Sequence, residues 1–388
     1  MSNRQPKKVF VAMSGGVDSS VAVALLKKQG YDVTGVFMKP WSPALDSRLS
    51  TIDKSCLWQK DREDAMRVAA KIGIPLLTWD FSKEYKKEVA DYMIREYRTG
   101  RTPNPDVMCN KHIKFGLFLE KALKEGADFI ATGHYVRITK HESRNMKQKS
   151  GSGACFVLRV ARDKNKDQSY FLWTLTQKQL KHCLFPIGDY IKPEVRKIAK
   201  RFSLPTHAKK DSQGVCFIGP LDMKGFLKNY IKPKRGNIIL WDNARSTLFA
   251  RSGRVVGQHD GIFYYTLGQR HGLDIKNGKG PYYVVKKDLK KNIVYVGSKK
   301  DLLFQKMKLT RINWINRPNQ PVDKRLRKSF IHRGEELDVR TRYRAPLSKA
   351  VVKNNGEVIF SKPETAVTPG QSAVFYKGDE LLGGGIII

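Results

Sequence analysis

Short apolar runs alternate with helical stretches over residues 1–135, and this alternation limits the fold more than any other feature of the sequence. Val9 to Met13 is a continuous apolar run, as in strands buried on both faces of a parallel sheet. Comparable runs follow at 33–38, 76–79 and 128–132. Because strands that alternate with helices are typical of a doubly wound parallel sheet, we expect an α/β domain over residues 1–221. Ligands of such sheets bind at the carboxyl ends of the strands.

The rest of the chain is richer in strand signals. Two strand-like pieces flank a polar loop with Arg144, Lys147 and Lys149, which predicts a hairpin with a basic tip over residues 135–160. Helical patterns return over 177–202, and after Asp222 glycine and proline are frequent between short strands. Short strands with regular turns are typical of small barrels. We therefore expect a central β-rich domain at 222–299 and a C-terminal β-barrel at 300–388.

The charge of the chain is strongly unbalanced. Lys and Arg total 73 against 36 Asp and Glu, a formal net charge of +37. Such a surplus attracts polyanions, and nucleic acid is the first candidate because cations that neutralise phosphates release counterions. The alternative is a lysine bias of the whole proteome without a specific partner.

The cysteine pattern points to a reducing compartment. The five cysteines form no C-x-x-C pair, so a disulfide scaffold or a zinc ribbon is not expected. No apolar run approaches the roughly 18 residues of a membrane span, and a strand that begins at Val9 leaves no room for a cleaved leader. We expect a cytoplasmic protein without membrane contact, and a monomer.

A glycine loop between the first strand and the first helix is the clearest candidate site. It reads Ser14-Gly15-Gly16-Val17-Asp18-Ser19-Ser20. Glycines let a phosphate approach the backbone, and the helix amino terminus supplies N–H donors and a favourable dipole. The loop is neither a Walker A loop nor G-x-G-x-x-G. The alternative is an ordinary strand–helix turn capped by serine.

Two cysteines stand in polar segments. Cys109 follows Asn104-Pro105-Asp106, a turn signal, so we expect it on a loop or at a helix start, where a thiol pKa falls. Lys111 and His112 would lower that pKa further. Cys216 lies in a polar segment with glycine and nearby lysines. The alternative for each cysteine is a small buried hydrophobe, which we expect of Cys56, Cys155 and Cys183.

The glycine loop resembles the pyrophosphatase loop (PP-loop) of the ATP-cleaving superfamily that includes GMP synthetases and tRNA-modifying adenylating enzymes. Seven further strings follow in order, and the set resembles the bacterial tRNA-specific 2-thiouridylases (MnmA/TrmU family) over essentially the whole chain. These strings are Gly100–Asp106, Cys109–Lys111, Ala131–Tyr135, Lys166–Phe171, Asp211–Gly219, Thr266–Arg270 and Thr368–Ala373. The resemblance implies a Rossmann-like PP-loop domain.

The resemblance also implies a reaction: ATP-dependent thiolation at C2 of the wobble uridine (U34) in tRNAs for Lys, Glu and Gln. AMP on the C2 oxygen would make a leaving group, and Cys216 would carry the sulfur as a persulfide. Cys109, the nucleophile, would then leave a transient Cys109–Cys216 disulfide, which needs Cα atoms within about 7 Å. Asp106 would be the general acid/base. The sulfur would come from a donor protein, a cysteine desulfurase or a relay carrier.

The family's binding residues carry over onto two sets. Asp18 would also hold Mg²⁺ on the pyrophosphate, since hard cations prefer carboxylate oxygen. The ATP set is Ala12, Met13, Ser14, Gly15, Gly16, Val17, Asp18, Ser19, Met38 and Gly133. The tRNA set is Asn104, Pro105, Asp106, Lys166, Asp167, Gln168, Arg342 and Tyr343.

Several alternatives remain open beside this interpretation. The basic stretch Lys224–Arg235 is either a contact for the RNA backbone or a solvated loop. Arg342 and Tyr343 suit a phosphate and a base, but the pair is also ordinary for a barrel surface. The segment 40–53 has no assignment. The fold could also serve a nitrogen-transferring ligase, which needs no paired cysteines, or an RNA-binding module that has lost its chemistry.

Overall fold

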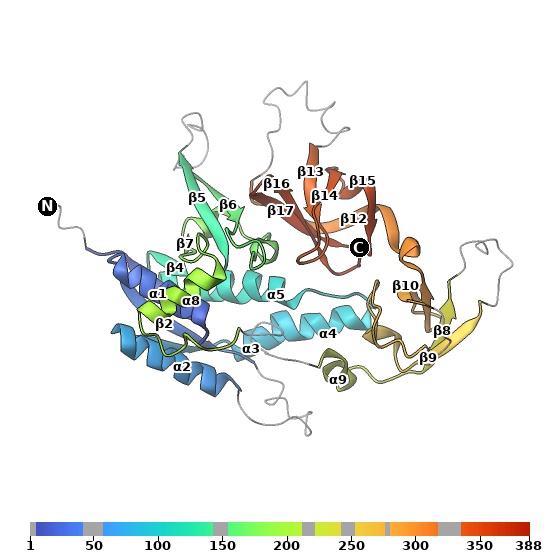
Figure 1. The fold of residues 1–388 in the computed structure, drawn as a ribbon, viewed down its shortest axis with the longest axis horizontal. Helices are drawn as coiled ribbons and strands as arrows, with labels where there is room; N and C mark the ends of the chain where they lie inside the picture. Colours follow the sequence, from blue (N-terminus) through green and yellow to red (C-terminus); the bar gives the residue numbers. More distant parts are fainter. Residues whose placement is uncertain are drawn as a thin grey trace.

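The computed structural model describes residues 5–41, 57–142, 154–211, 222–241, 253–275, 280–316 and 335–388. An α/β domain is followed by a central β region and a C-terminal barrel (Figure 1). Cys56, Cys216, the tip of the basic hairpin and most of segment 40–53 lie outside the described residues.

The α/β domain is built on a five-stranded parallel sheet, as expected. Its strand order is β3-β2-β1-β4-β7. Successive side chains of β1 enter two different cores: Val9, Val11 and Met13 face one cluster, Phe10 and Ala12 the other. A strand covered on both faces must be apolar throughout, which explains the continuous run. The strands are β1 (Lys8–Met13), β2 (Asp32–Lys39), β3 (Leu76–Asp80), β4 (Phe129–Ala131) and β7 (Cys183–Leu184).

The helices cover both faces of this sheet. One core cluster contains apolar residues of α1, α2 and α8, and the other contains those of α4, α6 and the π-helical stretch between α5 and α6. The α-helices are α1 (Val17–Lys28), α2 (Leu57–Ile72), α3 (Ser82–Tyr85), α4 (Asp91–Arg98), α5 (Pro105–Met108), α6 (Phe118–Lys124), α7 (Gln177–Leu180) and α8 (Lys192–Arg201). Two π-helical stretches, Lys86–Ala90 and Cys109–Leu117, join α3 to α4 and α5 to α6.

Helices return over 177–202 as expected, but a short strand separates them. Helix α7 ends at Leu180, strand β7 pairs with β4, and α8 begins at Lys192. Pro186 and Gly188 lie between β7 and α8, and proline does not continue a helix. A two-residue strand leaves no periodic signal in a sequence.

The C-terminal region is a closed six-stranded barrel, as expected. Its strands run in the order β12-β15-β14-β13-β16-β17, and pairing of β12 with β17 closes it. Closure removes the exposed sheet edges. The strands are β12 (Leu303–Trp314), β13 (Glu335–Arg340), β14 (Ser348–Val352), β15 (Glu357–Thr365), β16 (Ser372–Lys377) and β17 (Glu380–Ile387).

The expected hairpin forms, and it extends the barrel's sheet. Strands β5 (Val136–Glu142) and β6 (Ala154–Val160) pair with each other, and β6 also pairs with β17. Arg137 and Arg159 both bind Asp379, which precedes β17. The hairpin therefore joins the first and last regions of the chain.

The central region contains a four-stranded sheet of order β10-β11-β8-β9, with its own small apolar core. Helix α9 (Met223–Lys228) precedes it and lies beside the end of α4 (Figure 1). Its strands are β8 (Gly236–Leu240), β9 (Val255–His259), β10 (Tyr283–Asp288) and β11 (Ile293–Gly297). Single turns of 3-10 helix occur at Ser169–Phe171, Ile262–Tyr264 and Lys299–Leu302. Among the described residues, no helix combines the length and apolar character needed to span a bilayer.

Candidate active site

The glycine loop connects β1 to α1 at the carboxyl edge of the sheet. Gly15 has φ +69°, and a Cβ there would lie 2.1 Å from the carbonyl oxygen of Asp61, so only glycine fits. Gly16 is the N-cap of α1 and gives its first turn no side-chain hydrogen bond. The first amides of a helix need partners, and phosphate oxygens are suitable ones.

Serine side chains hold the loop in shape. The Ser14 amide donates to Ser19 Oγ at 3.2 Å, and Ser20 Oγ donates to the carbonyl oxygen of Gly16 at 2.7 Å. Thr206 donates in turn to Ser20 Oγ at 3.1 Å. The Ser20 hydroxyl is thus used to fix the backbone, which leaves the amides at the start of α1 as candidate donors to a phosphate.

Gly133 follows β4 and touches the start of α1. A Cβ on Gly133 would lie 2.7 Å from the amide nitrogen of Ser19 and 2.8 Å from the carbonyl carbon of Asp18. The strand order turns back between β1 and β4, and ligands of doubly wound sheets bind at such a point. Gly133 therefore lies against the glycine loop at the point of the sheet where a ligand is expected.

Asp18 belongs to a chain of charged groups. Its Oδ1 accepts hydrogen bonds from the Tyr135 hydroxyl at 2.8 Å and from Lys192 Nζ at 2.7 Å. Lys192 also pairs with Asp211 at 2.9 Å, and Lys166 reaches the other oxygen of Asp211 at 2.5 Å. Burial opposes ionisation of Asp211, but the hydrogen bonds from Lys166 and Lys192 lower its pKa to about 2. The last described residue before the segment of Cys216 is thus joined to the glycine loop.

The candidate nucleophile Cys109 lies just after a short capped helix, α5. Asn104 caps α5, and its Oδ1 accepts a hydrogen bond from the amide of Val107 at 3.2 Å. Cys109 follows α5 as the first residue of a π-helical stretch and is fully buried. The expectation of a loop or helix start was therefore wrong for Cys109, although Asp106 lies in the first turn of α5. Local π-helix is frequent at functional sites.

His112 does not supply the positive charge expected near Cys109. Burial, together with the charge of Lys111, lowers the pKa of the His112 imidazole. The charged form of His112 is therefore disfavoured, which runs against the expectation of a cation there.

The string Lys166–Phe171 connects the two halves of the site. Gln168 exchanges hydrogen bonds with the backbone of Tyr135, at 2.9 Å in each direction, and Tyr135 contacts Asp18. Three residues later, the carbonyl oxygen of Phe171 accepts a hydrogen bond from Asn110 at 3.3 Å. A continuous path of contacts thus runs from the glycine loop to the neighbour of Cys109.

Thr102 joins all three regions of the chain. Its amide donates to the carbonyl oxygen of Pro369 at 2.9 Å, and its carbonyl oxygen accepts from Gln371 at 2.9 Å. Its hydroxyl lies 3.1 Å from that of Thr266. Three of the strings noted in the sequence therefore meet immediately before Asn104 and Asp106.

Comparison with known proteins decides the family. Three domain models match in succession: a tRNA methyl transferase HUP domain at 7–220, a tRNA methyl transferase PRC-barrel domain at 224–298, and an aminomethyltransferase β-barrel domain at 304–387. The tRNA-specific 2-thiouridylase MnmA of Bacillus licheniformis is 46% identical over 393 residues, which cover 98% of this chain and 94% of that protein. The chain belongs to the tRNA-specific 2-thiouridylase family.

Other relatives agree on the family. The tRNA-specific 2-thiouridylase MnmA of Bacillus subtilis strain 168 is 46% identical over 389 residues, covering 98% of this chain and 94% of the relative. The protein of the same name from Streptococcus thermophilus CNRZ 1066 is 44% identical over 397 residues, with 100% and 96% covered.

Several residues have partners within the protein in this structure, although the resemblance to the 2-thiouridylase family assigns them to tRNA binding. Asp167 is 4% exposed and accepts hydrogen bonds from the amide of Ala161 and the hydroxyl of Ser169. Arg342 donates to the carbonyl oxygen of Leu267 and to Thr368, so it ties the central region to the barrel. Their assignment to tRNA stays a prediction, and contact with RNA would compete with these bonds.

Tyr343 and Lys166 are placed differently. The Tyr343 ring packs on Phe171 with centroids 4.5 Å apart, and the Arg344 guanidinium lies over the Tyr343 ring, 5.1 Å from its centroid. Lys166 is half-buried against Asp211. Both residues therefore lie along the string that links the glycine loop to Asn110.

The residues around Asp18 fit Mg²⁺. Mg²⁺ is usually held by one or two carboxylates together with phosphate oxygens of the substrate. The Asp18 side chain is 33% exposed, and its Oδ1 takes the two hydrogen bonds described above. Within the described part of the chain, no cluster of three or more His, Cys, Asp and Glu side chains could hold a metal by itself. A metal at this 2-thiouridylase site would therefore depend on the pyrophosphate.

Lys209 is a residue of the site that sequence reasoning missed. Its ammonium group contacts Asp61 at 2.7 Å, Asp64 at 2.6 Å and the carbonyl oxygen of Gly15 at 3.0 Å. Burial opposes the charged form, but the two carboxylates raise the pKa of Lys209 overall. Lys209 thereby fastens the glycine loop to α2. No short motif announces a contact between residues so distant in the sequence.

Replacing Lys209 by methionine should raise the KM for ATP about tenfold, because the loop loses a charged hydrogen bond worth about 1.5–3 kcal/mol, partly screened by solvent. Steady-state kinetics with varied ATP measures the effect. Lys210→Met is the matched control, since Lys210 is the adjacent, exposed lysine. Equal changes in the two variants would show that the loss of charge, rather than of the contact, matters.

Proposed function

We propose that this chain is a tRNA-uridine 2-sulfurtransferase that uses ATP to replace the C2 oxygen of the wobble uridine (U34) by sulfur in tRNAs for Lys, Glu and Gln. The family, whose curated members are named tRNA-specific 2-thiouridylases, supports thiolation of tRNA. The observation that carries the proposal is the path of contacts through Lys166–Phe171, which joins Asp18 and Asp211 to Asn110 beside Cys109.

The first step is activation of the uracil ring. The C2 oxygen attacks the α-phosphorus of ATP, and pyrophosphate leaves toward the glycine loop, whose amides and helix dipole accept its charge. Mg²⁺ held by Asp18 would neutralise charge on the leaving pyrophosphate. Lys192, paired with Asp18, is a further cation beside the same group. The C2 carbon then carries AMP, a good leaving group.

The second step transfers sulfur. The terminal sulfur of a Cys216 persulfide attacks C2, and AMP departs with the former C2 oxygen. The Cys109 thiolate then attacks Cys216 Sγ, which breaks the bond between Cys216 Sγ and the transferred sulfur and leaves 2-thiouridine with a Cys109–Cys216 disulfide. A thiol reductant resets the two cysteines, and a cysteine desulfurase or relay carrier restores the persulfide.

Asp106 and the burial of Cys109 complete the proposal. Asp106 lies one helical turn before Cys109, and we assign it the proton transfers at the uracil ring, where a carboxylate in reach contributes general acid/base catalysis. Because the thiol of Cys109 is buried, a movement must expose it before it attacks. We also propose that the other residues assigned to tRNA binding contact the tRNA, and that the protein is cytoplasmic and monomeric.

Reconstitution tests the function directly. The full chain is incubated with ATP, Mg²⁺, cysteine and a cysteine desulfurase as sulfur donor, a thiol reductant and a tRNA transcript with U34, and the digested nucleosides are analysed by mass spectrometry. The proposal predicts 2-thiouridine that depends on ATP and on U34. Incorporation of nitrogen in place of sulfur would support the ligase alternative, and RNA binding without any modified nucleoside would support the RNA-binding module.

A further inference from the structure

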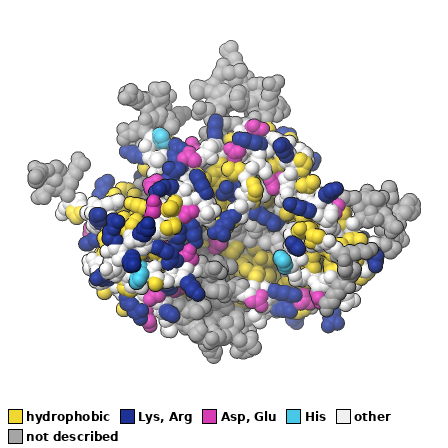
Figure 2. Space-filling view, in the orientation of Figure 1, with side chains coloured by type: hydrophobic (Ala, Val, Ile, Leu, Met, Phe, Trp, Pro, Cys, Tyr) yellow, Lys and Arg dark blue, Asp and Glu magenta, His cyan; other side chains and the backbone are white. Residues whose placement is uncertain are grey.

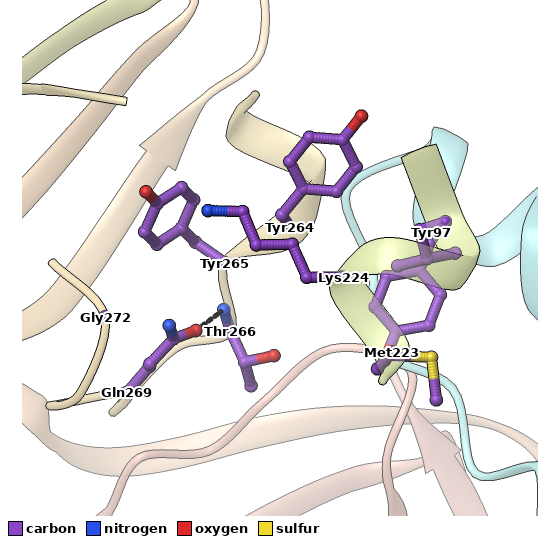
Figure 3. A pocket seen from close by; sticks show the side chains of 9 residues that line it. Tyr97, Met223, Lys224, Tyr264, Tyr265, Thr266, Gln269 and Gly272 are labelled. Carbon is purple, nitrogen blue, oxygen red and sulfur yellow. Dashed lines mark hydrogen bonds between the residues drawn. The ribbon is translucent and has the colours of Figure 1, made fainter. Parts of the chain in front are cut away.

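A small pocket lies where the central region meets α4 and α9, outside the site described above. Its volume is about 280 Å³, and aromatic rings and one lysine dominate its lining (Figure 3). Pockets for drug-sized ligands occupy about 300–1,000 Å³, so this one suits a single small group. The lining residues are Tyr97, Met223, Lys224, Leu227, Tyr264, Tyr265, Thr266, Gln269 and Gly272.

The aromatic walls are held in place by the surrounding structure. The Tyr264 hydroxyl donates to the carbonyl oxygen of Ile231 at 2.5 Å. Lys287 Nζ, from β10, donates to the carbonyl oxygen of Tyr265 at 2.7 Å, and the Tyr265 ring packs against His259. Tyr97 is largely buried at the end of α4. Walls fixed in this way bind a ligand without a large cost in ordering them.

Lys224 gives the pocket a positive charge. Its side chain runs from α9 toward the ring of Tyr265 (Figure 3) and pairs with Asp260 at 3.1 Å. Lys228, one helical turn later, pairs with the other oxygen of Asp260 at 3.0 Å and is equally exposed, but it does not line the pocket. The two lysines therefore differ mainly in their position relative to the pocket.

The pocket adjoins the segment that carries Asp106. Thr266 lines the pocket, and its hydroxyl lies 3.1 Å from that of Thr102. Thr102 and Asp106 are four positions apart in the sequence, a span of at most roughly 14 Å. A ligand group in the pocket and a uridine at Asp106 can therefore belong to one continuous strand of RNA.

We propose that this pocket binds one unstacked base of the RNA substrate, in a nucleotide of the same loop that flanks the reacting uridine. The inference rests on the proposed function. Proteins that recognise single-stranded RNA stack splayed bases on aromatic side chains and neutralise the neighbouring phosphate with a cation. Tyr97, Tyr264 and Tyr265 supply the rings, and Lys224 supplies the cation. Lys and Arg side chains are spread over the face shown in Figure 2, which favours a polyanionic ligand.

The test compares RNA binding by the wild type and by variants of the full chain. The probes are a tRNA transcript and the same transcript with an abasic site at each anticodon-loop position in turn, and Kd is measured at fixed salt. For the wild type, loss of the base at one position flanking the reacting uridine should weaken binding about tenfold. In Lys224→Met and in Tyr264→Leu the intact transcript should bind more weakly, and loss of that same base should have little further effect.

Lys228→Met is the matched control, and the full abasic penalty should persist in it. Equal behaviour of Lys224→Met and Lys228→Met would overturn the pocket, because the effect would then be a general charge effect. A wild type that thiolates tRNA but shows no position coupled to Lys224 and Tyr264 would overturn it as well. A wild type that neither binds nor thiolates the transcript would instead contradict the proposed function, on which the pocket depends. Thermal melting shows whether each variant is folded.

Discussion

Replacement of Cys216 by serine is expected to lower 2-thiouridine formation by at least about a thousandfold while the affinity for ATP stays unchanged. A hydroxyl cannot carry a persulfide, so no sulfur reaches the activated C2 carbon. Residues that act as one catalytic unit show losses of this size when one member is removed. The glycine loop and its supports, Asp18, Lys192 and Lys209, are untouched by the substitution. Nucleoside mass spectrometry and equilibrium dialysis with ATP measure the two quantities.

Cys155→Ser is the control for the loss of a thiol. Cys155 is half-buried, and its Sγ donates to Asn316 Oδ1 at 3.2 Å, a bond that a serine hydroxyl can replace. We expect wild-type thiolation from this variant. Thiolation that persists in Cys216→Ser would show that another group carries the sulfur and would contradict the assignment of Cys216.

Replacement of Asp106 by asparagine is expected to lower kcat by about a hundredfold to ten-thousandfold, the usual contribution of a general acid or base. Asparagine has nearly the same shape, so the cap of α5 by Asn104 and the position of Cys109 should be retained. The KM values for ATP and tRNA should therefore change by only a few-fold. Single-turnover kinetics with saturating ATP isolates the chemical steps.

Asp32→Asn provides the comparison for a lost carboxylate. Asp32 is exposed at the start of β2, at the edge of the sheet opposite the carboxyl ends of the strands. Its substitution should leave kcat unchanged. A kcat for Asp106→Asn within a few-fold of the wild type would exclude Asp106 as the proton-transferring group.

The parts of the fold that follow from local pattern could be predicted from the sequence. The apolar run Val9–Met13 and the glycines after it predicted a buried strand and a ligand-binding turn, because burial on both faces and a positive φ at Gly15 each restrict the residue type. Tertiary contacts were not accessible in this way. The pairing of β6 with β17 and the contacts of Lys192 and Lys209 join residues far apart in the chain, and periodicity reports only neighbours.

The side-chain roles show the same limit. Cys109 was expected on a loop or at a helix start with cationic neighbours, but it lies buried in a π-helical stretch, and burial lowers the pKa of His112. Arg342 was expected to contact tRNA through its positive charge, whereas its guanidinium donates hydrogen bonds to Leu267 and Thr368. A sequence names the chemical group but not the partner that the fold provides for it.

The central claim is that the thiols of Cys109 and Cys216 meet during sulfur transfer. The most direct measurement is a single turnover with persulfide-loaded enzyme, ATP, Mg²⁺ and tRNA transcript, without reductant, followed by non-reducing peptide mapping by mass spectrometry. The account predicts one Cys109–Cys216 disulfide for each 2-thiouridine formed. Stoichiometric 2-thiouridine with both thiols unlinked would contradict it.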